Sequence, residues 1–184
     1  MRYDDSDMKI VGSGGITIGA DGSSEDDRRT ESEYERQLGN GNLARARRLG
    51  ATLADSAERL ESDGPAVTDA ISAHKKMMML FALVIGIEEE LDDQLLRRAA
   101  LNVFYDTLKK EKPLLYDSMS SSGAFTFYYL DYRKGGDRTA RLSKSFAMLC
   151  GREDDEELAK CGGGIFNEYR DYAKRAIGEM SFVK

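Results

Sequence analysis

Eleven consecutive apolar residues, Met77 to Ile87, lead directly into an acidic block at residues 88–93. A run of this length is too short to cross a bilayer, because a membrane-spanning helix needs roughly 20 apolar residues. A helix that is apolar on every side has to be covered by other helices. The run therefore predicts a soluble helical domain built around one buried central helix, from about residue 66 to residue 89.

The composition fits an all-α protein. Two prolines and no tryptophan among 184 residues are compatible with long helices, and 41% hydrophobic with 33% charged residues is typical of a globular domain with a solvated surface. We predict a compact bundle of about six or seven helices in a single domain, residues 25–184. A non-helical arm rich in glycine, serine and aspartate, residues 1–24, precedes it.

Hydrophobic periodicity and breaker residues give the expected helices. Gly39-Asn40-Gly41 is a strong signal for the end of the first helix, after which we expect Asn42 to cap the second helix. Pro113 marks a break, and residues 118–123 are typical of a loop with capping serines. The expected helices are residues 24–38, 42–61, 66–89, 91–110, 124–133, 138–150 and 153–180.

Two of these helices carry small residues where another helix could approach closely. The second has a narrow seam of small and leucine side chains suited to antiparallel helix packing or to a dimer: Leu43, Ala46, Gly50, Leu53, Ala57 and Leu60. The last keeps one helical phase across Gly162–Gly164, so we favour one long helix whose glycines contact a neighbouring helix. The alternative is a break there, since glycine costs about 1 kcal/mol in a helix interior relative to alanine.

Charge and cysteine content narrow the function classes. The net charge is -6, and residues 1–40, with ten acids and five bases, account for -5 of it. This charge argues against a nucleic-acid partner, and it indicates no membrane partner. Cys150 and Cys161 are too few for a disulfide scaffold or a zinc site. Two reduced thiols and the absence of a signal-peptide pattern favour a cytoplasmic protein.

Acidic pairs are the first candidate for chemistry. Glu153 with Glu156 and Glu168 with Asp171 are each spaced i, i+3 on the last expected helix. Together they resemble the Glu-x-x-Glu then Glu-x-x-Asp pattern of the MazG-like all-α nucleotide pyrophosphohydrolases, which implies a Mg²⁺-dependent phosphohydrolase acting on nucleotides. The pattern departs from that family because both pairs lie on one helix, whereas the family needs facing helices. A solvated acidic face is the alternative.

An aromatic stretch followed by bases is the second candidate. Tyrosines can stack on nucleobases and arginines can bind phosphates in a fork. The residues of this possible ligand site are Tyr128, Tyr132, Arg133, Arg138 and Arg141. The alternative is that the aromatics belong to the core and the bases balance the acidic blocks.

No motif in the chain specifies a reaction. The single histidine, His74, excludes sites that need two or more histidines, and it lies in phase with core positions of the central helix. We therefore expect no cofactor and a non-catalytic binding or assembly protein, with a protein partner or self-association. The alternatives are the Mg²⁺-dependent phosphohydrolase and a nucleotide- or nucleic-acid-binding regulator.

Overall fold

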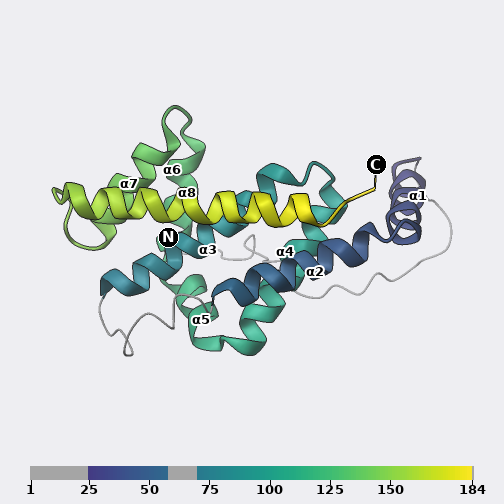
Figure 1. Cartoon of the computed structure of the whole chain (residues 1–184), viewed down its shortest axis with the longest axis horizontal. Coiled ribbons are helices and arrows are strands. Elements are labelled where there is room, and N and C mark those ends of the chain that lie inside the picture. The colour runs from purple at the N-terminus through teal and green to yellow at the C-terminus, as the bar shows by residue number, and fades with distance from the viewer. Residues whose placement is uncertain (1–24, 58–69, 184) are drawn as a thin grey trace, which may run out of the picture. The chain divides into compact units, whose positions relative to one another are not determined.

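The computed structural model describes residues 25–57 and 70–183, with side chains from Thr30 onward. Every regular element in these residues is a helix, which confirms the predicted all-α class (Figure 1). The predicted arm at residues 1–24 lies outside the described residues. The described helices are α1 Glu25–Gly39, α2 Asn42–Asp55, α3 Ala70–Glu90, α4 Gln94–Glu111, α5 Pro113–Ser121, α6 Ala124–Arg133, α7 Arg138–Leu149 and α8 Glu156–Glu179.

By its internal contacts the chain divides into two units, Met1–Glu33 and Tyr34–Lys184. The helical bundle belongs to the second unit. The boundary predicted after residue 24 falls inside the first unit and stays a prediction.

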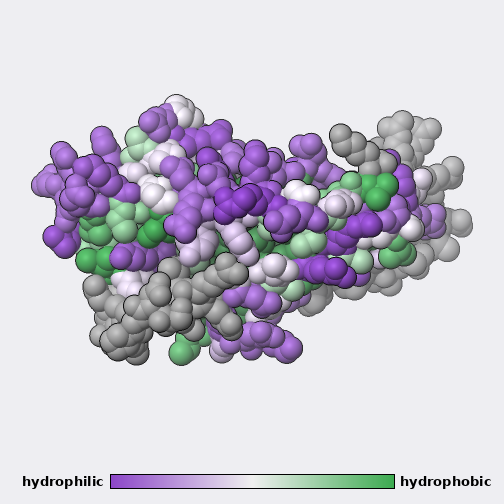
Figure 2. All heavy atoms as spheres, viewed as in Figure 1, coloured by the Kyte–Doolittle hydropathy of each residue, from purple (hydrophilic) through white to green (hydrophobic). Residues whose placement is uncertain are grey.

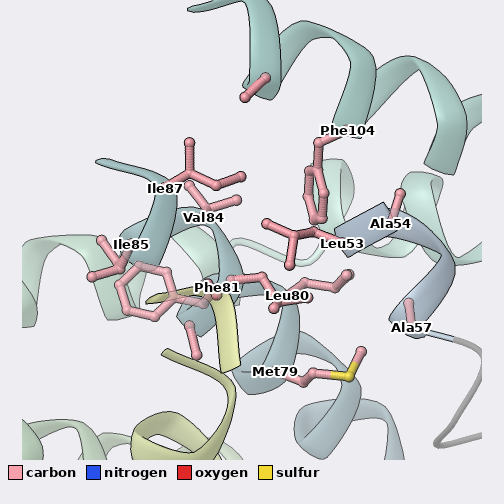
Figure 3. Packing of buried hydrophobic residues seen from close by; sticks show 14 of the residues in the cluster. Leu53, Ala54, Ala57, Met79, Leu80, Phe81, Val84, Ile85, Ile87 and Phe104 are labelled. Atoms are coloured by element: carbon pink, nitrogen blue, oxygen red, sulfur yellow. The ribbon is translucent and has the colours of Figure 1, made fainter. Parts of the chain in front are cut away.

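Helix α3 is the centre of the bundle, as its apolar run predicts. All eleven residues from Met77 to Ile87 are buried. Figure 3 shows Leu80 and Val84 of α3 next to Leu53 of α2 and Phe104 of α4. Because the whole circumference of α3 is covered, its apolar side chains contribute to the core on every side.

Aromatic rings join α3 to the helices on its other side. The ring of Phe81 has its centroid 5.4 Å from that of Phe125 and 5.7 Å from that of Tyr128, both on α6. It also lies 6.1 Å from the ring of Phe166 on α8. The predicted helix at 124–133 is therefore confirmed, and its aromatic residues pack against the central helix.

Within the described residues, Ala70–Glu90 is the one helix whose length and composition would allow it to cross a membrane. The central helix of a water-soluble protein has the same length and composition. Here the apolar part of α3 packs against other helices of the chain, so composition by itself does not identify a membrane span.

Glycines allow several of the described helices to approach closely, among them α2 with α4 and α7 with α8. A Cβ atom at Gly50 of α2 would lie 2.2 Å from the carbonyl oxygen of Ala100 in α4. Helix α8 is continuous, as favoured from the sequence, and a Cβ at Gly162 or Gly163 would lie 2.4 Å or 2.2 Å from side-chain atoms of α7. Gly164 has nothing within 4 Å, so the predicted helix contact involves the first two glycines only.

The loop expected at residues 118–123 is wrong for residues 118–121, because residues 113–121 form helix α5. Proline occupies the first turn, where its missing N–H costs nothing. Within this helix the serine hydroxyls donate to main-chain carbonyls of the preceding turn, Ser118 to Leu114 and Ser121 to Asp117. The fourth helix also begins later than expected, at Gln94, because Asp93 caps it by accepting from the N–H groups of Leu95 and Leu96.

Candidate functional site

The tyrosine–arginine segment of α6 and α7 is mainly structural. Tyr128 is fully buried against Phe81, and burial raises the pKa of its hydroxyl well above the ordinary value. Among the described residues this hydroxyl has no hydrogen-bond partner. A ligand at the surface therefore has no access to Tyr128.

Tyr132 and Arg138 come together as predicted, but Glu89 of α3 joins them. The Tyr132 hydroxyl donates to Glu89, and Arg138 donates to Glu89 at 3.1 Å and to the tyrosine oxygen at 3.0 Å. The Arg138 guanidinium also lies over the Tyr132 ring, 4.5 Å from its centroid. Burial and the bond to Glu89 raise the pKa of Tyr132 to about 12. Arg138 thus uses Nη1 for contacts within the chain, and its side chain is 48% exposed.

The two other predicted arginines lie apart from this triad. Arg133 is exposed and stacks over Tyr129, 5.8 Å from its ring centroid. Arg141 is half-buried near Asp131. Burial raises the pKa of Asp131, but hydrogen bonds from Lys134 and Ser145, with smaller contributions from the charges of Lys134 and Arg141, hold it below its usual value. The ion pairs with carboxylates in this region are those of Arg138 with Glu89 and of Lys134 with Asp131.

The acidic pairs do not converge. Glu156 begins α8, Glu153 precedes the helix, and Glu168 and Asp171 lie near its middle. Twelve residues of helix separate Glu156 from Glu168, a distance of about 18 Å. In the part of the chain that the structure describes, no group of three or more His, Cys, Asp or Glu residues could hold a metal ion. The Mg²⁺ site stays a prediction that this arrangement does not favour.

A small cavity lies between the end of α2 and the middle of α8. It has a volume of about 150 Å³, and its lining residues are Ser56, Glu168, Tyr169, Tyr172 and Arg175. The Ser56 hydroxyl donates to the main-chain oxygen of Leu53 at 2.6 Å. A space of this size takes a group no larger than about one benzene ring. Of the four predicted metal-binding carboxylates, Glu168 is the one among these lining residues.

The end of α1 presents a different kind of surface. Between Tyr34 and Gly39 only Gln37 is buried. Tyr34 and Leu38, one helical turn apart, are 41% and 54% exposed. Figure 2 shows a mostly hydrophilic face with a few separate apolar groups, one of them where the described chain ends in Figure 1.

A buried polar network holds this surface on the bundle. Asn42, at the start of α2 and 1% exposed, donates to Gln37 at 2.7 Å and to the main-chain oxygen of Val183 at 2.7 Å. Its oxygen accepts from the main-chain N–H of Val183 at 2.9 Å and from Arg45 at 3.2 Å. Gln37 in turn donates to Asp93 at 2.7 Å. The network therefore fixes the end of α1 to the starts of α2 and α4 and to residues 181–183.

The role predicted for Asn42 is wrong in detail. Gly41, in a left-handed conformation with φ of 77°, occupies the cap position, and Asn42 is the first helical residue. Its side chain is used for bonds to residues far away in sequence, which local patterns do not reveal. The one available signal for this site was the apolar pair Tyr34 and Leu38 in an otherwise charged helix.

Comparison with known proteins gives no relative to guide the interpretation. No protein-family model matches the chain, and no curated protein and no solved structure matches it.

Proposed function

We propose that this protein is a non-catalytic binding and assembly protein, and that it self-associates through the exposed face of α1. The observation that carries the proposal is the exposure of Tyr34 and Leu38 on a helix end that buries Gln37 alone. An isolated helix of about 12–15 residues is only marginally stable in water. A partner that covers this face would therefore stabilise the helix as well as the complex.

A second copy of the chain is the simplest partner for this face. In a twofold dimer each copy contributes the same patch, so Tyr34 and Leu38 of both copies would be buried together. Covering Leu38 contributes about 1 kcal/mol per copy, roughly half the value for a whole leucine side chain, because half of its surface is already covered. Such an interface is small, and we expect the association to be weak and dependent on protein concentration.

Two half-buried cysteines, Cys150 and Cys161, carry free thiols. Free thiols are typical of a reducing compartment, and we propose that the protein is cytoplasmic.

The test compares two leucines that are almost equally exposed, Leu38 on α1 at 54% and Leu130 on α6 at 57%. Sedimentation velocity over a wide concentration range should show the wild-type chain moving from 20.5 kDa toward twice that mass. Leu38→Glu should remain monomeric, while Leu130→Glu should behave as the wild type. A wild-type chain that stays monomeric, or equal behaviour of the two variants, would contradict the proposal.

A further inference from the structure

We infer that Asn42 is a receptor for the main chain of an extended segment, and that in the assembled protein residues 181–183 of a second copy replace the chain's own at this site. The inference rests on the proposed self-association and specifies how the two copies are held. Three observations carry it: the way Asn42 binds Val183, the backbone of Ser181, and the position of the α1 face.

The Asn42 side chain binds the main chain of a single residue, Val183. The N–H and the C=O of Val183 both bind the same side-chain amide, at 2.9 Å and 2.7 Å. The Val183 side chain is 48% exposed and takes no part in these bonds. Paired main-chain bonds of this kind are how a β-strand edge binds an extended peptide.

Side chains of α1 and α2 also bind the receptor residue Asn42. Asn42 is 1% exposed, and Gln37 and Arg45 use its remaining donor and acceptor capacity, at 2.7 Å and 3.2 Å. If the segment left, one donor and one acceptor of a buried amide would lose their partners. The site therefore favours being filled, by the chain's own segment or by an equivalent one.

Ser181 provides a hinge for the exchange. It follows directly after the cap of α8, and its φ of 50° is the only positive value among the described non-glycine residues. Residues other than glycine adopt this left-handed conformation at a cost in free energy. An extended Ser181 would remove that cost and direct Val183 away from its own Asn42.

A second copy is the occupant that fits best. Its segment restores every bond that the first copy gives up, which makes exchange of an identical element a low-cost route to a dimer. The Tyr34–Leu38 face lies on the same end of α1 as Gln37, whose buried side chain binds Asn42 directly. Copies that meet through α1 would therefore bring their 181–183 segments close to each other's receptors.

The test uses the full chain in a mixed sample. One batch carries ¹³C-labelled valine methyl groups, the other ¹⁵N and no ¹³C, and the two are combined at a concentration where dimers form. If the two copies exchange their 181–183 segments, nuclear Overhauser effects should connect the Val183 methyl groups of one copy with the Asn42 side-chain amide of the other. If a dimer forms but these effects occur only within single chains, the exchange is refuted and the α1 association stands.

Two substitutions at the hinge make the result specific. Ser181→Gly removes the free-energy cost of the left-handed conformation in the chain that binds its own segment. It should therefore reduce the exchanged fraction about five- to tenfold. Ser181→Pro, which cannot adopt a positive φ, should increase the exchanged fraction. Equal exchanged fractions in the two variants would overturn the hinge, and a monomeric wild-type chain at all concentrations would overturn the proposed function together with this inference.

Discussion

Gly50→Ala tests the close approach of α2 and α4. An alanine Cβ would lie 2.2 Å from the carbonyl oxygen of Ala100 and 3.0 Å from the main-chain nitrogen of Phe104. Ordinary contacts begin at 3.4 Å, so the two helices would have to separate by about 1 Å to make room. Because both atoms belong to the backbone of α4, no side-chain rotation relieves the clash.

The size of the effect follows from two opposing terms. Overpacking a core contact costs about 1–3 kcal/mol, and a backbone clash belongs at the upper end. Replacing glycine by alanine within a helix contributes about 1 kcal/mol in the other direction. We therefore expect Gly50→Ala to lower the free energy of unfolding by about 1–2 kcal/mol.

Gly164→Ala is the matched control, because its Cβ would have no neighbour within 4 Å. It should raise the free energy of unfolding by up to about 1 kcal/mol through helix propensity. Urea unfolding followed by circular dichroism measures both variants, with equal m-values as the condition for comparing them. Equal gains in stability at the two glycines would show that α2 and α4 do not approach as described.

Further predictions concern the core and the tyrosine network, each measured by urea unfolding. Phe81→Ala should cost about 3–5 kcal/mol, because a fully buried ring in contact with four others leaves a cavity. Tyr128→Phe should be neutral or stabilising because it removes a buried hydroxyl without a described partner, whereas Tyr132→Phe should cost about 1–2 kcal/mol because its hydroxyl binds Glu89. Burial raises the pKa of Asp131, but hydrogen bonds from neighbouring side chains outweigh it and hold that pKa below 3.8. Its carboxylate therefore stabilises the fold above the unfolded pKa and loses this effect as the pH falls through the folded value. Asp131→Asn should accordingly be less stable than the wild type at neutral pH, with the difference disappearing in acid; a difference that persists unchanged at low pH would contradict the assignment.

Patterns that follow local rules were predictable from the sequence. The apolar run of α3 has no polar face, so burial in the centre was the one available solution. Helix α8 keeps its phase across Gly162–Gly164, and tertiary contact with α7 compensates for the low helix propensity of the glycines. Helix α5 was missed because its serines favour caps and loops by type, whereas here their hydroxyls bond to carbonyls of the preceding helical turn.

The candidate site was less accessible to prediction because it depends on contacts between distant parts of the chain. Asn42 and Val183 are 141 residues apart, and Gln37 and Asp93 are 56 apart. Residue types suited to capping or surface positions form a buried network there. Conversely, Tyr132 and Arg138 have the residue types of a ligand site, but in the structure both donate hydrogen bonds to Glu89.

Hydrogen–deuterium exchange at low and high protein concentration tests most directly whether the protein assembles through α1. The account predicts that amides of Tyr34–Gly39 become more protected as concentration rises, because a second copy covers this helix end. Amides of Met77–Ile87, already in the centre of the bundle, should keep the same protection and serve as the internal control. Protection of Tyr34–Gly39 that does not change with concentration, under conditions where α3 remains fully protected, would contradict assembly through α1.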